Sequence, residues 1–249
     1  MDSHGTRFVS TDIVGGTDME NDMSEIDFFF DPMCPWAYQT SLWIREVRNQ
    51  NKLRINWRFF SLEEVNRPEG KKHPWERELA YGWSPLRVAA LLRRMDPALC
   101  DAWYLAIGRA LHEQGRKPHD PQTARELLTL IGVSPDIWDQ ALADETTHDD
   151  VKADHFFAAE ELGGFGVPVM VFPATTDRPR KAVFGPVVVP APMGADALAL
   201  WDVTVAYSKI NGLYEIKTPK TKADLTYIAR AFTPYLEGRD WESIQNPAP

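Results

Sequence analysis

Cysteine is scarce in this sequence, which contains only Cys34 and Cys100 among its 249 residues. Two cysteines cannot form the disulfide framework of a small secreted domain, and such low usage is typical of a reducing compartment. Long apolar runs are also missing, and the first 23 residues lack the apolar core of a secretory signal. We therefore expect a cytoplasmic protein with no membrane partner.

Basic residues and ligand motifs are lacking as well. The chain has 27 Lys and Arg against 36 Asp and Glu, a formal net charge of -9, whereas a nucleic-acid partner needs a basic face. The segment "GGFG" is not followed by "GKS" or "GKT", so it is not a phosphate loop. The histidines show no ligand spacing with cysteine or paired carboxylates. We expect no nucleic-acid partner, no metal and no tightly bound cofactor.

The first pattern that is present is strand, helix, strand. Residues 26–30 form a short apolar run, and residues 53–59 alternate between apolar and polar. Between them, apolar residues recur at spacings of three and four on one helical face, starting just after Cys34. A βαβ unit of this kind predicts two parallel strands. Residues 1–23 are polar and without a period, so we expect a flexible leader there.

The middle of the chain is expected to be helical. Four segments, "SPLRVAALLRRM", "DPALCDAWYLAIGRALHEQG", "DPQTARELLTLIG" and "SPDIWDQALAD", each begin with a capping residue followed by proline. Two further strands joined as a hairpin (167–172 and 181–184) and two helices (195–209 and 222–235) follow. The predicted domains are therefore a discontinuous α/β domain (24–66 and 163–217), a helical insertion (67–162), and a C-terminal helix and tail (218–249).

Cys34 stands at the first turn of the predicted helix, with Pro35 at the first helical position. Unpaired backbone N–H groups and the helix dipole favour a negative charge there, so we expect a lowered thiol pKa and a nucleophilic thiolate. The alternative is a buried structural cysteine, which the proline and the neighbouring Trp36 make the weaker interpretation. Cys100, on the apolar stripe of its own helix, is expected to be a core residue.

A second signal is Pro168 inside the apolar run "GGFGVPVMVF". Proline within a strand pattern normally demotes the strand. The conflict disappears if Pro168 begins the strand after a cis peptide bond, which is uncommon and usually marks a purposeful feature. An ordinary trans proline at a strand edge fits the stretch equally well, and these residues alone leave the two readings open.

Taken in order, strand, "CPWA" helix, strand, helical insertion and "GVP" strand hairpin resemble the DsbA/FrnE-like branch of the thioredoxin superfamily. Within it the chain is similar to mycothiol-dependent nitroreductases and disulfide-isomerase-like proteins, also through "FSLEEVN", "GWSPLRVA" and "FFAAEELGGFGVPVMVF". The resemblance covers about residues 25–217. It implies an α/β thioredoxin-like fold with an inserted all-helical domain, and Cys34 as the catalytic thiolate. It also implies that Trp36 shapes the surface around the sulfur and that a cis-proline loop at Val167-Pro168 binds substrate beside it.

The chain departs from that family at Ala37, where the relatives carry a second cysteine. Alanine cannot release a mixed disulfide, so the resemblance implies a monothiol enzyme that depends on a small thiol such as mycothiol. Its partners would be that thiol and a small electrophile or disulfide. Two alternatives stay open. One is a thiol-activating enzyme like kappa-class glutathione transferases and 2-hydroxychromene-2-carboxylate isomerases; the other is a non-catalytic binding module. Trp75, Trp83 and His112 are candidates to wall a pocket over the thiol, or are core residues.

Overall fold

The computed structural model describes residues 24–176 and 178–239, so the predicted leader lies outside the described residues. Four strands form one sheet in the order β2-β1-β3-β4. They are β1 (Glu25–Phe30), β2 (Arg54–Phe59), β3 (Val169–Phe172) and β4 (Lys181–Phe184). β1 and β2 are parallel, and β3 is antiparallel to both β1 and β4. The predicted βαβ unit and the predicted hairpin are both confirmed, and all four predicted strands share the sheet.

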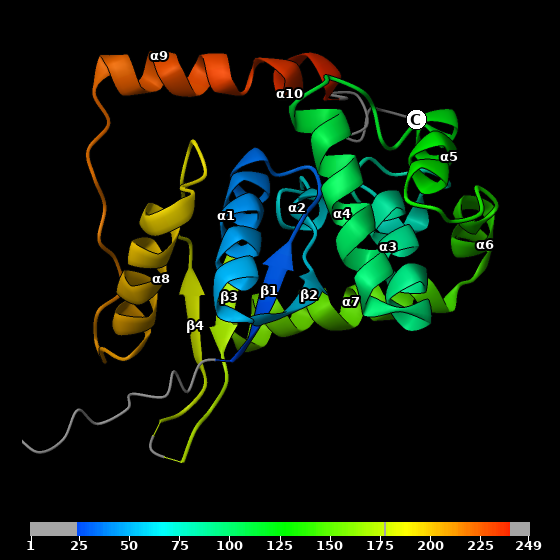
Figure 1. Ribbon diagram of the computed structural model, residues 1–249. Coiled ribbons are helices and arrows are strands. Elements are labelled where there is room, and N and C mark those ends of the chain that lie inside the picture. The colour runs from blue at the N-terminus through cyan, green and yellow to red at the C-terminus, as the bar shows by residue number, and fades with distance from the viewer. Residues whose placement is uncertain (1–23, 177, 240–249) are drawn as a thin grey trace, which may run out of the picture.

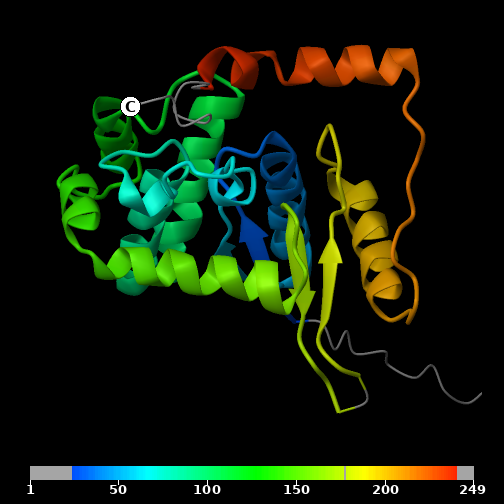
Figure 2. The ribbon, with the colours of Figure 1, turned by 180° about the vertical axis from the view of Figure 1, so that it is seen from behind.

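Side chains of β1 divide between the two faces of the sheet, as the period of two requires. Phe28 and Phe30 belong to the larger apolar cluster, together with Trp43 of α1 (Pro35–Asn51) and Trp201 of α8 (Gly194–Ser208). Phe29 instead packs in a second cluster with apolar residues that follow α7 (Thr146–Phe156). The sheet thus lies between α1 and α8 on one face and α7 on the other (Figures 1 and 2). Every residue of β3 is buried between these layers.

All the elements between β2 and β3 are helical. They are α2 (Leu62–Val65), the 3-10 helix η1 (Pro74–Glu76), α3 (Trp83–Met95), α4 (Pro97–His112), α5 (Pro121–Leu130), α6 (Ile137–Ala143), α7 and the π-helix η2 (Phe157–Glu161). Asp96 and Asp120 cap α4 and α5 as expected, each accepting a hydrogen bond from a backbone N–H of the first turn. Ser84 and Ser134 were expected as caps and are not. Ser84 lies inside the first turn of α3, where its hydroxyl accepts from the backbone N–H of Ala80.

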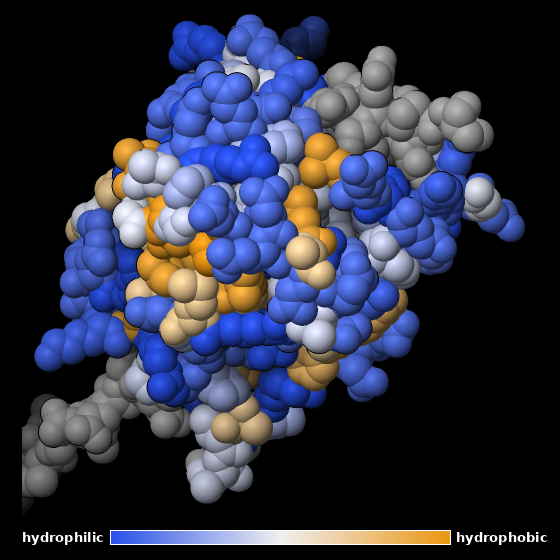
Figure 3. Space-filling view, turned by 90° about the vertical axis from the view of Figure 1, so that its right-hand side faces the viewer, coloured by the Kyte–Doolittle hydropathy of each residue, from blue (hydrophilic) through white to orange (hydrophobic). Residues whose placement is uncertain are grey.

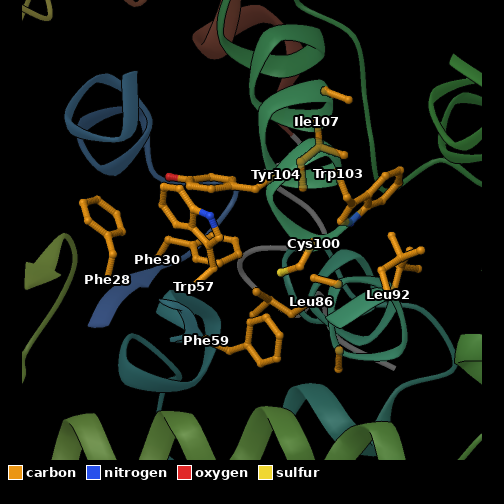
Figure 4. Packing of buried hydrophobic residues seen from close by; sticks show 14 of the residues in the cluster. Phe28, Phe30, Trp57, Phe59, Leu86, Leu92, Cys100, Trp103, Tyr104 and Ile107 are labelled. Atoms are coloured by element: carbon orange, nitrogen blue, oxygen red, sulfur yellow. The ribbon is translucent and has the colours of Figure 1, made fainter. Parts of the chain in front are cut away.

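Helices α3 and α4 extend the main core away from the sheet. Figure 4 shows the aromatic side chains of β1 and β2 meeting those of α4, with Cys100 among apolar neighbours from α3 and α4. The rings of Phe30 and Tyr104 stack with their centroids 3.8 Å apart. Arg45 of α1 is buried beside this contact and pairs with Asp101 of α4 at 2.7 Å. One continuous core therefore joins the βαβ unit to the helical block.

The C-terminal segment differs from the single helix expected over 222–235. It forms α9 (Lys222–Ala231) and α10 (Thr233–Gly238), with a break at Phe232. Pro234 explains the break, because a proline inside a helix removes a backbone hydrogen bond and clashes with the preceding turn. Figures 1 and 2 both show α9 and α10 crossing the end of the molecule toward which β1 points.

The side of the molecule that carries α5 and α6 is largely hydrophilic, with an apolar area near its middle (Figure 3). Among the large apolar residues of the helical block, Leu130 and Met95 are more than half exposed. In the part of the chain that the structure describes, none of the helices combines the length and the apolar character needed to cross a membrane.

Candidate active site

Cys34 is the N-cap of α1, directly after the loop that follows β1. Its backbone is extended (φ -87°, ψ 112°), and Pro35 occupies the first turn, as the sequence predicts. The sulfur accepts a hydrogen bond from the backbone N–H of Ala37 at 3.4 Å. A helix N-terminus offers several such unpaired donors. The geometry therefore aims the Cys34 side chain at the start of its own helix.

The loop before β3 lies against the same sulfur. The peptide bond between Val167 and Pro168 is cis. The Cys34 thiol donates a hydrogen bond to the backbone carbonyl of Val167, with sulfur and oxygen 3.5 Å apart. A second loop is fixed beside it, because the backbone N–H of Gly185 donates to the carbonyl of Pro168 at 2.9 Å. Two segments more than 130 positions apart in the chain thus meet at the thiol.

The expected acidity of Cys34 is wrong for this structure. Burial raises the pKa of the Cys34 thiol to about 12, although the N–H of Ala37 acts in the opposite direction. Only 5% of the residue is exposed, and desolvation of a thiolate outweighs the hydrogen bonds from the backbone N–H groups of Ala37 and Trp36. The charge of nearby Asp31 raises the pKa further. The sequence shows the helix N-terminus, which lowers the thiol pKa, but it does not show which side chains exclude water from the sulfur and raise that pKa.

Asp31 is the residue that the sequence analysis missed. Its carboxylate is 1% exposed and accepts hydrogen bonds from the backbone N–H groups of Met33 at 2.8 Å and Leu62 at 2.7 Å. Burial nevertheless raises the pKa of Asp31 to about 7. A side chain at Gly82 would place its Cβ 3.2 Å from an Asp31 oxygen. The sequence did contain a signal that could have identified Asp31: an acidic residue at the end of a predicted buried strand, three positions before the cysteine.

The neighbours of Cys34 in the motif have distinct environments. Ala37 is fully buried in the apolar cluster that also contains Cys34 and Val167. Trp36 is half-buried, and its ring meets the edge of Phe232, the residue between α9 and α10, with centroids 4.8 Å apart. The alanine therefore removes the second thiol without leaving a gap, and the tryptophan is partly covered by a residue from the far end of the chain.

His112 lies behind the active-site loop instead of on an open wall. Its Nε2 contacts the carbonyl oxygen of Pro32 at 2.9 Å, and its ring stacks against Tyr38. Burial lowers the pKa of His112 to about 4, so the imidazole is neutral and its Nε2–H donates to Pro32. The histidine thus supports the loop that presents Cys34, and a direct contact with substrate stays a prediction.

Trp83 is buried in this structure, as its core alternative has it, and a contact with substrate stays a prediction. Its side chain is buried in the main core, and its indole N–H donates to Nδ1 of His148 at 2.8 Å. Trp75 packs between Trp83 and Phe156 and carries Lys152 over its ring. Both tryptophans pack between helices of the insertion. Residue type and sequence position alone could not distinguish this role from that of a pocket wall.

No group of three or more His, Cys, Asp and Glu side chains is placed to bind a metal ion within residues 24–176 and 178–239. An open hollow lined by Glu25, Asp27, Val171 and Arg180 lies at the start of β1, at the opposite end of that strand from Cys34. Cys100 is buried in the main core, and burial raises its pKa to about 12. The chemistry that this region offers therefore rests on one thiol, its helix and the cis-proline loop.

A cysteine at the start of α1 facing a cis-proline loop, in a sheet interrupted by a helical block, defines a DsbA-like protein of the thioredoxin fold. Solved structures agree. A cytosolic disulfide reductase, DsbM from Pseudomonas aeruginosa with GSH, matches at a TM-score of 0.53 and 15% identity, over 73% of this chain and 99% of that one. A 2-hydroxychromene-2-carboxylate isomerase matches at a TM-score of 0.51 and 15% identity, over 73% of this chain and 94% of that one. At such identities these likenesses establish the fold alone.

Sequence comparison then gives the family. The family model described as "Rv2466c-like: Mycothiol-dependent nitroreductase Rv2466c" matches residues 33–218. The chain belongs to this family, as the resemblance in its motifs implied. A curated relative, the uncharacterized protein Rv2286c of Mycobacterium tuberculosis, is 53% identical over 222 residues, which span 89% of this chain and 94% of the relative.

Proposed function

We propose that this protein is a DsbA-like thiol oxidoreductase that acts through a single cysteine, Cys34, with a low-molecular-weight thiol such as mycothiol as co-substrate. The observation that carries the proposal is that the Cys34 sulfur lies next to position 37, which is occupied by alanine. The Cys34 sulfur lies 3.4 Å from the backbone nitrogen of Ala37 and faces the carbonyl of Val167. Position 37 is where a resolving thiol would stand, and its methyl group cannot take that role.

The other cysteine of the chain is a poor substitute for a resolving thiol. Cys100 is 1% exposed in the core of α3 and α4, whereas Cys34 packs in a separate apolar cluster with Ala37 and Val167. A disulfide requires Cα atoms no more than about 7 Å apart and matching side-chain directions. Bringing these two sulfurs together would need the main core to open, so the reaction must be completed from outside the chain.

The proposed cycle has two exchange steps. The Cys34 thiolate attacks one sulfur of a disulfide, a new bond joins Cys34 to that sulfur, and the other sulfur leaves as a thiolate. A small thiol, entering as its thiolate, then attacks the substrate sulfur of the mixed disulfide. This step forms a disulfide between the small thiol and the substrate and returns Cys34 as a thiolate. The substrate disulfide is exchanged, and the protein ends in its starting state.

The buried thiol sets a condition on this cycle. With a pKa near 12, Cys34 is almost entirely protonated at neutral pH, and its proton is held by the Val167 carbonyl. The resting protein is therefore protected from adventitious oxidation. Hydration of the sulfur, when its cover is displaced, would restore the effect of the helix N-terminus and lower the pKa. Because the cycle needs a supply of small thiol, we place the protein in the cytoplasm.

The test is a burst experiment on protein purified without reductant. A chromogenic aromatic disulfide should release one equivalent of its thiol per protein and then stop, leaving a mixed disulfide that mass spectrometry assigns to Cys34. Added mycothiol, or N-acetylcysteine as a simpler probe, should restore continuous turnover. Cys34→Ser should show no burst, and Cys100→Ala, the matched control, should keep it. Rapid turnover by the wild type with no small thiol present would refute the monothiol cycle.

The same experiment separates the thiol-activating alternative. If the protein joins the small thiol to an electrophile such as a chlorinated nitroarene, and Cys34 never carries a mixed disulfide, the chain works as a transferase or isomerase. Absence of both reactions would favour a binding module that has kept the fold.

A further inference from the structure

The last helices that the structure describes, α9 and α10, and the residue between them pack against the residues on both sides of Cys34. Trp36, two positions after the thiol, meets the ring of Phe232. Met33, one position before it, packs in a small cluster with Tyr81 and Leu111, and Tyr235 lies against that cluster. The ring of Tyr235 also lies 5.4 Å from that of His112. Two side chains from the C-terminal segment therefore pack against the residues that precede and follow the thiol in the sequence.

Few buried residues attach this segment to the part of the protein that the structure describes. All residues between Ser208 and Phe232 are exposed or only half-buried, and α9 buries no side chain. Beyond α9, Phe232 and Gly238 are the buried residues, and α10 rests on α4. A Cβ added at Gly238 would stand 2.8 Å from the carbonyl oxygen of Gly115, so the two backbones touch at a point where only glycine fits. A segment with so few buried contacts opens at low free-energy cost.

The segment also lies outside the residues that the family model matches. The family match ends at residue 218, just before α9. Figures 1 and 2 show α9 and α10 bridging from the α8 side of the molecule to the end of α4, across the end where α1 begins. The core of the fold is complete without this bridge, because the sheet and its covering helices end at α8.

We propose that residues 221–238 form a strap that closes over Cys34, and that Phe232 limits the closed site to small substrates. In the closed state the thiol is dehydrated and shielded, and release of α10 uncovers Trp36 and Met33 together. A small disulfide or electrophile needs a brief, partial opening, whereas the disulfide of a folded protein needs complete release of the strap. The strap therefore makes the enzyme selective for small molecules. This inference rests on Cys34 as the reacting thiol of the proposed function.

The test compares two maleimides that differ only in size, N-ethylmaleimide and a maleimide carrying a polyethylene glycol chain, on the full-length protein. Peptide mapping assigns modification to Cys34 and excludes Cys100. The first variant, Gly238→Ala, pushes α10 off Gly115 at a distance from the thiol and keeps a good helix former in α10. The second, Phe232→Ala, removes the ring over Trp36. Leu236→Ala is the control, because Leu236 is an exposed apolar residue of the same helix.

In urea-unfolded protein, the ratio of the small-reagent rate to the large-reagent rate reports the effect of reagent size alone. In the folded wild type we expect this ratio to be at least about tenfold higher. Gly238→Ala and Phe232→Ala should each raise the large-reagent rate at least about tenfold, with a smaller gain for the small reagent. Leu236→Ala should change neither rate by more than about twofold. These results would support the strap.

Unchanged rates in both variants would overturn it, as would a wild type that reacts equally with both reagents. If the large-reagent rate rises in Phe232→Ala but not in Gly238→Ala, the Phe232 ring shields the thiol only locally. That result would overturn a strap that moves as a unit. Alkylation requires no turnover, so these outcomes are independent of the burst experiment. If the maleimide rates support the strap but Cys34 never exchanges with disulfides in the burst experiment, the strap is retained and the proposed function is refuted.

Discussion

Restoring the missing cysteine is the most direct perturbation of the site. In Ala37→Cys the new side chain lies one helical turn beyond Cys34 on the same face. Residues three apart on a helix have Cβ atoms about 5–6 Å apart, slightly more than the roughly 3.5–4.5 Å of a disulfide. The extended backbone of Cys34 closes this difference, because its sulfur already points at residue 37 and lies 3.4 Å from that backbone nitrogen. We expect an intramolecular disulfide without movement of the helix.

The two redox states of this variant should differ in stability. Position 37 is fully buried, so an added thiol overpacks the reduced form and destabilises it by about 1–3 kcal/mol. Oxidation joins the two sulfurs into one compact group, which relieves part of that strain. It also closes a four-residue loop, which stabilises the folded state by about 2 kcal/mol through the entropy of the unfolded chain. Oxidised Ala37→Cys should therefore unfold at a higher urea concentration than its reduced form.

Three measurements check this prediction. Thiol titration in denaturant should find Cys100 as the free thiol after oxidation, and urea unfolding with and without dithiothreitol should give the stability difference. The oxidised variant should convert one equivalent of a dithiol substrate to its disulfide without any small thiol, its own disulfide being reduced to two thiols in that step. Ala37→Ser, similar in size and without a thiol, is the matched control and should show neither effect. A folded variant that stays reduced in oxidised glutathione, or that carries glutathione on Cys34, would refute the proposed geometry.

Three further predictions follow from the buried charges. The alkylation rate of Cys34 in the wild type should rise continuously between about pH 7 and pH 10, because its pKa is raised to about 12; a rate that levels off near pH 8 would contradict the burial argument. Asp101→Ala should lower the free energy of unfolding by about 3–5 kcal/mol by leaving Arg45 buried without its partner, whereas Arg94→Ala, which removes two ion pairs that are more exposed, should cost at most about 1 kcal/mol for each pair. The Asp31 carboxyl titrates at about 7 when folded and near 3.8 when unfolded, so the folded state holds more protons between these values and stability should fall as pH rises through them. Urea unfolding of Asp31→Asn should show a shallower pH dependence over this range, and an unchanged slope would assign it to other groups.

Much of the fold follows from local patterns in the sequence. The alternation over 53–59 and the apolar run over 26–30 each predicted a strand, and the helical spacing between them made the pair parallel. Asp96 and Asp120, each followed by proline, marked two helix starts because a cap needs only its own first turn. For the same reason, the position of Cys34 at the start of α1 was readable from "CPWA". Each of these features depends on residues within a few positions of one another.

The chemistry of the site was decided by residues far apart in the sequence. The acidity of Cys34 was predicted with the wrong sign, because part of its desolvation comes from Ala158, Val167 and Val169, more than 100 positions away. The sequence left Trp83 open between a pocket wall and the core, because it could not show that His148 would accept its N–H. The contact of Phe232 with Trp36 joins opposite ends of the described chain. Local spacing sets where a backbone begins a helix or strand, whereas exclusion of water, which sets the pKa and access of a buried thiol, exists only once distant segments have packed together.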